Sequence, residues 1–204
     1  MAMGRPRAFC ADKALDRALE VFWRKGYEGA SLTELTDAMG INRPSLYAAF
    51  GNKEALFRKA LDRYVTEKAA YLREALSAPT AREVCERLLL GAAAMLTDPC
   101  HPVGCLAVRG ALTCGDEAES VKREIAEIRE RFDTDFRNRL ERGLEDGDLP
   151  SGTDIAALAR FVSTVIQGMS IQAASGATCE DLRQVAETAL VALPRQPATA
   201  EPAE

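Results

Sequence analysis

Apolar residues recur along the chain at intervals of three and four positions, which is the spacing of one face of an α-helix. The first clear set follows the i, i+3, i+4, i+7 pattern and consists of Leu15, Ala18, Leu19 and Phe22. Gly26 follows this stretch, where a glycine commonly ends a helix by adopting the left-handed conformation. No alternation of apolar and polar residues typical of a strand competes with this spacing. The sequence therefore predicts an all-α protein.

Two short helices are predicted next, with a tight connection between them. Ser31 and Glu34 have the spacing of a capping box at the start of the first helix, and Gly40 ends it. Asn42 is a good N-cap for the second helix, and Pro44 lies in its first turn, where the missing N–H costs nothing. Two short helices joined by a tight turn, preceded by a longer helix, describe a helix-turn-helix.

The rest of the chain is also predicted to be helical. After the N-cap Asn52 we expect one connecting helix as far as Leu76, and then helices over 82–96, 104–112, 117–145, 154–174 and 179–193. A segment rich in proline, alanine and glutamate closes the sequence and is typical of disorder. The predicted organisation is a helix-turn-helix DNA-binding domain (1–52), a larger C-terminal helical domain for effector binding and dimerisation (53–193, with the connecting helix at 53–76), and a disordered tail (194–204).

The charge of the chain is unevenly distributed. The net charge is −5, which does not by itself favour nucleic acid. Residues 1–64, however, hold 11 Lys+Arg and 8 Asp+Glu, a net of +3, whereas residues 65–204 hold 15 and 23, a net of −8. A basic N-terminal part with an acidic remainder fits a DNA-binding domain attached to a body that phosphate repels. No apolar segment is typical of a signal peptide or a membrane span, so we expect a cytoplasmic protein with no membrane partner.

The amino-terminal end of the second short helix offers side chains that could read DNA. A helix fits the major groove of B-DNA, and its first residues reach base edges. Arg43 can donate two hydrogen bonds to guanine, Pro44 presents an apolar face to a thymine methyl, and Ser45 can bind a base or a phosphate. Neighbouring polar groups could hold the DNA backbone. The predicted DNA-binding residues are Ser31, Thr33, Asn42, Arg43, Pro44, Ser45, Tyr47 and Lys53.

Three of these residues also have plainer interpretations. Tyr47 could pack in the core, and Arg43 and Lys53 could be ordinary surface charges.

Three segments of this region resemble the DNA-binding domain of the TetR family of bacterial repressors. They are SLTEL at 31–35, GINRPSLY at 40–47 and FGNKEALF at 50–57, and the likeness extends over residues 10–57. It implies an all-helical homodimer with a DNA-binding domain of three N-terminal helices and a ligand-binding, dimerising remainder. It also implies operator contacts at Thr33, Arg43, Ser45, Tyr47 and Lys53. Ala49 departs from the pattern, because many members have histidine there, and one possible phosphate contact is thereby lost.

The larger domain predicts a cavity without revealing its ligand. The helical spacing directs apolar side chains toward a common interior, where a few polar groups would orient a bound molecule. Each of these residues could equally have a structural role only. The predicted effector-binding residues are Met95, Cys105, Arg109, Phe132, Phe136, Phe161 and Gln167.

The six cysteines are expected to be mostly reduced thiols. Cys105 is predicted in the first turn of a helix, where the dipole stabilises a thiolate. With Cys100 or Cys114 as a resolving thiol, it could sense electrophiles or oxidants, as some members of the TetR family do through a cysteine near this place. The alternative is a buried cysteine that only fills space. A metal site made from these cysteines and His101 is not expected, because the spacing matches no standard zinc pattern.

The last two predicted helices have small and apolar faces that suit a four-helix dimer interface. The residues on these faces are Leu158, Val162, Val165, Met169, Ala173, Leu182, Val185, Ala189 and Leu190. Two DNA-binding domains must lie one DNA turn apart, or a multiple of it, to bind a palindrome. An effector could release DNA by shifting the connecting helix and changing this separation.

These features together predict a repressor that binds a palindromic operator in double-stranded DNA as a homodimer. A small-molecule or thiol-reactive signal would release it, and no enzymatic activity or cofactor is expected. Within the same class, an activator or a regulator without a small-molecule effector remains an alternative. From another class, the alternative is a helical thiol-redox protein or enzyme that uses Cys105. The single histidine, and the lack of a phosphate-binding loop or a nucleophile–base–acid pattern, argue against the enzyme.

Overall fold

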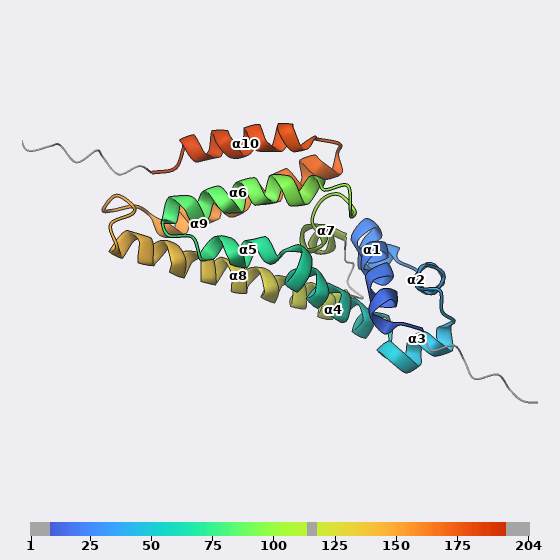
Figure 1. Cartoon of the computed structure of the whole chain (residues 1–204). Helices are drawn as coiled ribbons and strands as arrows, with labels where there is room; N and C mark the ends of the chain where they lie inside the picture. Colours follow the sequence, from blue (N-terminus) through green and yellow to red (C-terminus); the bar gives the residue numbers. More distant parts are fainter. Residues whose placement is uncertain (1–8, 114–117, 195–204) are drawn as a thin grey trace, which may run out of the picture.

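The computed structural model describes residues 9–113 and 118–194, with backbone only for residues 110–113. Every regular element within these residues is helical, which confirms the all-α prediction. Cys114 and residues 195–204 of the predicted tail lie outside the described residues. Figure 1 shows two parts, which we call the head (α1–α3) and the body (α4–α10).

The head contains three helices, and their bounds follow the capping residues of the sequence. They are α1 (Ala11–Gly29), α2 (Leu32–Met39) and α3 (Arg43–Phe50). The predicted apolar stripe of α1 is buried, from Leu15 at 9% exposure to Phe22 at 0%. Phe22 meets Phe57 of α4 (Lys53–Arg63) edge-on, with ring centroids 5.0 Å apart. Gly26 has the predicted positive φ of 73°, although helical hydrogen bonding resumes beyond it as far as Gly29.

The predicted connecting helix is not continuous. It consists of α4 (Lys53–Arg63), a π-helical turn η1 (Tyr64–Lys68) and α5 (Ala70–Leu76). The N–H of Ala69 donates to the carbonyl of Tyr64 at 2.9 Å, which is the wider ring of a π-helix. Both Tyr64 and Ala69 are buried, at 2% and 6% exposure. The extra residue in this turn places both of them on the inner side, which a regular α-helix with 3.6 residues per turn would not do.

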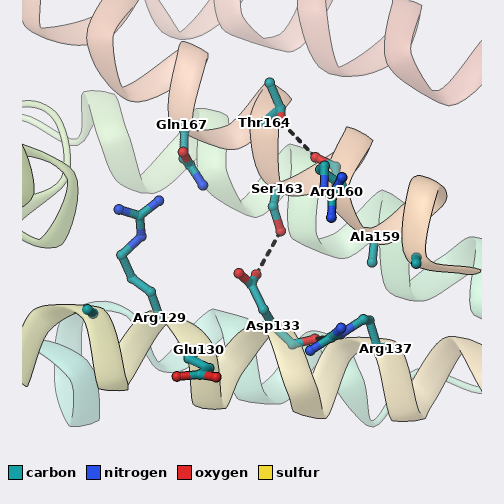
Figure 2. A pocket seen from close by; sticks show the side chains of 11 residues that line it. Arg129, Glu130, Asp133, Arg137, Ala159, Arg160, Ser163, Thr164 and Gln167 are labelled. Atoms are coloured by element: carbon teal, nitrogen blue, oxygen red, sulfur yellow. Dashed lines mark hydrogen bonds between the residues drawn. The ribbon is translucent and has the colours of Figure 1, made fainter.

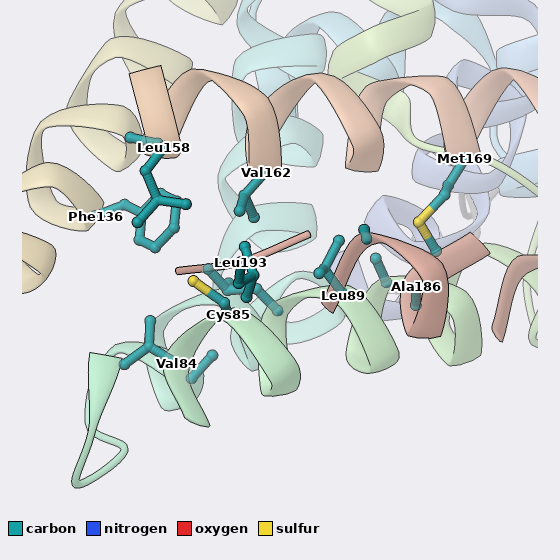
Figure 3. Close-up of a cluster of buried hydrophobic side chains, with 14 of the residues drawn as sticks. Val84, Cys85, Leu89, Phe136, Leu158, Val162, Met169, Ala186 and Leu193 are labelled. Atoms are coloured by element: carbon teal, nitrogen blue, oxygen red, sulfur yellow. The ribbon is translucent and has the colours of Figure 1, made fainter. Parts of the chain in front are cut away.

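The body is built around α6 (Ala81–Thr97), which packs against α5, α8, α9 and α10. The remaining helices are α7 (Leu106–Thr113), α8 (Glu119–Glu145), α9 (Ile155–Ala174) and α10 (Cys179–Val191). Figure 3 shows the core between α6 and α9, with Val84 and Leu89 facing Val162 and Met169. All four of these side chains are at most 1% exposed.

This core corrects the predicted dimer faces of α9 and α10. Most of the predicted residues are buried within the monomer, namely Leu158, Val162, Met169, Ala173, Leu182 and Ala189. They pack in the core around α6, which the spacing alone could not distinguish from a second subunit. The uncovered apolar residues of these helices are Phe161, Ile171, Val185 and Val191.

Among the described helices, only α9 is long and apolar enough to cross a membrane by length and composition. In the fold this helix contacts α6, α8 and α10. Only 28% of its apolar window is buried in the single chain, so much of its surface lacks a cover within the chain.

Candidate nucleic-acid interface and effector cavity

Local caps fix the start of α2 and α3. The Ser31 hydroxyl accepts from the backbone N–H of Glu34 at 3.2 Å, and the Glu34 carboxylate accepts from the Ser31 N–H at 3.1 Å. This is the predicted capping box. The Asn42 side chain accepts from the N–H of Ser45 at 2.9 Å, so the amino-terminal end of α3 begins at the predicted residue. Gly40 between the helices has a φ of 67°, which a residue with a side chain rarely adopts.

The Glu34 carboxylate is also paired with Lys25 of α1. The hydrogen bonds from Lys25 and Ser31 lower the pKa of Glu34 to about 2. The group is therefore ionised at any pH near neutrality. Its negative charge suits the amino-terminal turn of α2, where the helix dipole is positive, and ties α2 to α1.

The amino-terminal end of α3, which is predicted to contact DNA bases, is on the surface. Arg43 and Pro44 are exposed, Ser45 is half-buried, and Tyr47 is 48% exposed. The ring of Tyr47 therefore does not belong to the core, contrary to its plainer interpretation. The inward face of α3 is formed by Leu46 at 0% and Phe50 at 6%, so the helix presents its polar side outward.

Two of the predicted DNA-binding residues contact each other across the helix-turn-helix. The guanidinium of Arg43 donates to the hydroxyl of Thr33 at 2.9 Å. Both side chains are exposed, and the bond joins the start of α2 to the start of α3. The bond holds the cationic group of Arg43 beside the exposed start of α3.

Lys53 lies at the start of α4, and an aromatic residue that sequence reasoning missed accompanies it. Its ammonium group lies 4.6 Å from the centroid of the Tyr27 ring. The Tyr27 ring packs edge-on against Phe57 at 5.3 Å. A cation over a ring face is attracted by the negative face of the ring. Apart from its position directly after Gly26, nothing in the sequence pointed to Tyr27 as a neighbour of Lys53.

The body contains a cavity of about 370 Å³ between η1 and helices α4–α9. Of the predicted effector-binding residues, Met95, Phe132 and Gln167 line it. Phe136 is fully buried in the core, and Phe161 is 39% exposed on α9; neither lines the cavity. Sequence reasoning missed Tyr64, Tyr71 and Arg129, which do line it, because their direction depends on how several helices pack together.

A polar groove of about 480 Å³ lies beside the cavity, between α8 and α9. Figure 2 shows its charged and polar side chains, including Asp133 on α8, which accepts from the hydroxyl of Ser163 on α9 at 2.9 Å. The groove and the cavity adjoin each other, because four residues line both: Arg129, Asp133, Ser163 and Gln167.

Cys105 precedes α7 rather than lying in its first turn, which corrects the prediction. Its carbonyl accepts from the N–H of Arg109 at 3.0 Å, the position of an N-cap residue. Its sulfur accepts from the hydroxyl of Tyr64 at 3.1 Å, and its N–H donates to Ser170 of α9 at 2.9 Å. Arg109 points away toward the head, where it donates to the carbonyl of Arg24.

The other described cysteines differ in environment. Cys85 is buried in the core, and burial raises the pKa of its thiol to about 12, which keeps it protonated and inert. Cys100 is exposed, and its hydrogen bond with Asp98 raises the pKa of its thiol. All cysteines in the described part of the chain are free thiols.

Trp23 of α1 joins the head to the body next to Cys105, and sequence reasoning missed this residue. Its indole N–H donates to the carbonyl of Gly104 at 2.9 Å. Its ring stacks on His101 at 4.5 Å and meets Tyr64 edge-on at 4.7 Å. Tyr64 also lines the cavity. A chain of direct contacts thus runs from the cavity and Cys105 to α1 of the head.

Known protein families match both the head and the body of this chain. Residues 14–60 match the family model "Bacterial regulatory proteins, tetR family", and residues 81–189 match "Tetracyclin repressor-like, C-terminal domain". The HTH-type transcriptional repressor ComR of Escherichia coli (strain K12) is 34% identical over 92% of this chain and 90% of its own. The repressor BdcR of the same organism is 32% identical over 88% and 86%.

A solved structure is similar over nearly the whole chain. The TetR family transcriptional regulator CifR, as a cysteine mutant with 26-bp double-strand operator DNA, is 48% identical with a TM-score of 0.88, covering 94% of this chain and 100% of that one. These likenesses extend across the head and the body together and favour a regulator over the alternative of an enzyme or thiol-redox protein. The chain belongs to the TetR family of bacterial regulatory proteins and is a helix-turn-helix, DNA-binding transcriptional regulator rather than an enzyme.

Proposed function

We propose that this protein represses transcription by binding a palindromic operator as a homodimer, and that a signal received in the body releases it. The observation that carries the proposal is the capped, outward-facing start of α3, with Arg43 bonded to Thr33 and Tyr47 on the surface. Arg43 is suited to guanine, and Thr33, Tyr47 and Lys53 are suited to phosphates. The relatives ComR and BdcR, both repressors, and CifR with its operator DNA support this function.

The homodimer is proposed from the uncovered apolar surface of α9 and α10. Phe161, Val165, Val185 and Ala189 line a groove of about 550 Å³ between these helices. Phe161 and Val185 are 39% and 43% exposed. A second copy would cover this surface and bring two heads together, as a symmetric operator requires. This assembly also accounts for the low burial of the apolar helix α9.

Two kinds of signal have a site in the body. The cavity lined by Met95, Phe132 and Gln167 has the size of a small-molecule site. Cys105 is half-buried and hydrogen-bonded to Tyr64, a residue of the cavity wall. Occupancy of the cavity or modification of the thiol would disturb Tyr64 and, through Trp23, the head. Such a disturbance would change the separation of the two heads.

The test of DNA binding is selection of a sequence from random duplexes by the full-length protein, with its mass measured by light scattering. We expect a palindrome bound by one dimer. A protein that stays monomeric and selects no sequence at moderate salt would refute the proposal.

The thiol signal is tested separately with Cys105→Ser and with Cys100→Ser as the control. We expect both variants to bind the selected operator. N-ethylmaleimide should release the wild type and Cys100→Ser but not Cys105→Ser. Equal release of all three would remove Cys105 from the mechanism and leave the cavity as the site of the signal.

A further inference from the structure

The cavity of the body is divided into an apolar interior and a polar mouth. Apolar side chains from η1 and four helices form the interior, namely Val65, Leu72, Leu76, Met95, Phe132 and Ile166. Tyr71 also lines the cavity, and burial keeps the pKa of its phenol far above the usual value, so it stays neutral. The interior therefore suits a hydrocarbon and offers no charge to it.

The mouth is formed by the side chains of two hydrogen-bond donors. Arg129 of α8 and Gln167 of α9 line both the cavity and the groove, and Figure 2 shows them extending toward the same space from opposite helices. Both are half-buried. Within residues 9–113 and 118–194, neither side chain makes a hydrogen bond or an ion pair. Neither donor is held by another described side chain, so both are available to a ligand.

The other charges near the mouth do not neutralise Arg129. Asp133 carries a negative charge at the same mouth, but its carboxylate accepts from the hydroxyl of Ser163 rather than from Arg129. Four exposed residues at the rim balance each other in sign: Asp62, Arg73, Arg131 and Asp135. The groove adds two exposed arginines, Arg137 and Arg160, against one exposed carboxylate, Glu130. With Asp133 included, the other charges of the mouth and groove balance, four arginines against four carboxylates, so Arg129 is left as a half-buried cation in excess.

We propose that the cavity binds an amphipathic carboxylic acid whose hydrocarbon part fills the apolar interior. The carboxylate accepts hydrogen bonds from the guanidinium of Arg129 and the amide of Gln167. Arginine and a carboxylate match in geometry and form charge-assisted hydrogen bonds. This inference deepens the proposed function, because it names the chemical class of the small-molecule signal.

The test compares three probes with the same hydrocarbon chain, namely octanoate, octanol and octylamine. Trp23 is the only tryptophan of the chain, and its ring lies 4.7 Å from that of Tyr64 in the cavity wall, so its fluorescence reports binding. Thermal shift gives a second readout. We expect octanoate to bind about tenfold more tightly than octanol, as loss of a charged hydrogen bond would dictate, and octylamine to bind more weakly than either.

The variant Arg129→Met removes the charge and keeps an apolar stem. Its affinity for octanoate should fall by about tenfold, whereas its affinity for octanol should not change. Arg142→Met removes the same charge from an exposed position of α8 outside the cavity and should behave as the wild type. Equal binding of octanoate and octanol, preference for octylamine, or undiminished octanoate binding by Arg129→Met would each overturn the inference.

Operator binding by the ligand-free protein separates this inference from the proposed function. A protein that binds its palindrome but does not prefer octanoate contradicts only the ligand class. A protein that prefers octanoate but binds no palindrome contradicts only the DNA-binding function. Preferential binding of octanoate that leaves the operator occupied supports the ligand site and assigns release to another signal.

Discussion

The head carries its candidate functional residues on the outer side of its helices, whereas the body carries them on the inner side. In the head, most of the residues suited to DNA are exposed, and caps within a few residues of sequence fix the helices that carry them. In the body, the cavity is internal, and its wall depends on how α5–α9 pack. Exposure and local capping are properties of short sequence segments, whereas a cavity is a property of the whole packing. The DNA-binding residues of the head can therefore be predicted from the sequence, whereas the cavity of the body can be found only in the structure.

The largest effect is expected at the proposed dimer surface of the body, which would bring two heads together. Val185→Glu puts a charge on the apolar surface of α10, which is 43% exposed in the single chain and so tolerates the change. If a second copy covers this surface, the charge would be buried and the dimer would dissociate. Operator affinity should then fall by about a hundredfold or more through loss of bivalent binding, measured by gel shift and light scattering.

Val191→Glu is the matched control for this prediction, because Val191 lies on the same helix, is 70% exposed and does not line the α9–α10 groove. It should remain dimeric. A dimeric Val185→Glu protein with full affinity would show that the subunits meet elsewhere.

The second effect concerns the head alone. Arg43→Ala should lower operator affinity by about tenfold to hundredfold, as loss of a bidentate contact to guanine predicts. Because Arg43 is exposed and its side chain bonds, among the described residues, only to exposed Thr33, the free energy of unfolding should change by no more than about 0.5 kcal/mol. Competition with unrelated duplex DNA checks specificity. An unchanged sequence preference would show that this arginine does not read bases.

The third effect lies at the contact between the two parts. Trp23→Phe keeps an aromatic ring against His101 and Tyr64 but loses the hydrogen bond to Gly104. The buried carbonyl is left without this donor, so unfolding should become easier by about 1–3 kcal/mol. DNA release by the signal should weaken while ligand-free operator binding persists. Release identical to that of the wild type would show that the signal travels by another path.

The smallest effect is expected at Lys53. Lys53→Met removes one candidate phosphate contact, so the slope of log affinity against log salt should become shallower by about one unit. Tyr27→Leu should give part of the same change, because the ring beneath the ammonium group is lost. Titrations at several salt concentrations measure the slope. A slope that neither substitution changes would place Lys53 away from the DNA.

The sequence was most informative where residues act locally. Ser31 and Asn42 identified the starts of α2 and α3, because their side chains accept hydrogen bonds from backbone N–H groups. Gly40 identified the end of α2, because it adopts the left-handed conformation. The stripe that begins with Leu15 identified the buried side of α1. Spacing could not tell which partner an apolar face meets, so Val162 and Met169 were assigned to a dimer interface although they pack on α6.

The candidate site in the body was predicted only in part, for a similar reason. Met95, Phe132 and Gln167 line the cavity, but Phe136, about one helical turn beyond Phe132 on α8, is in the core. Trp23 and Tyr64 were missed because their importance comes from each other and from Gly104, which are distant in sequence. The interruption of the connecting helix at Tyr64 has no signature in residue spacing.

That interruption has a consequence for how the protein can change by single insertions or deletions. The turn η1 (Tyr64–Lys68) contains one residue more than a regular helix would need. Deleting one residue there would leave a regular α-helical turn, and the helices on either side would keep nearly the same relative orientation, because the wider turn absorbs one residue. A change of one residue in length at this place therefore alters which side chains of the turn face inward rather than the angle between the two halves of the molecule.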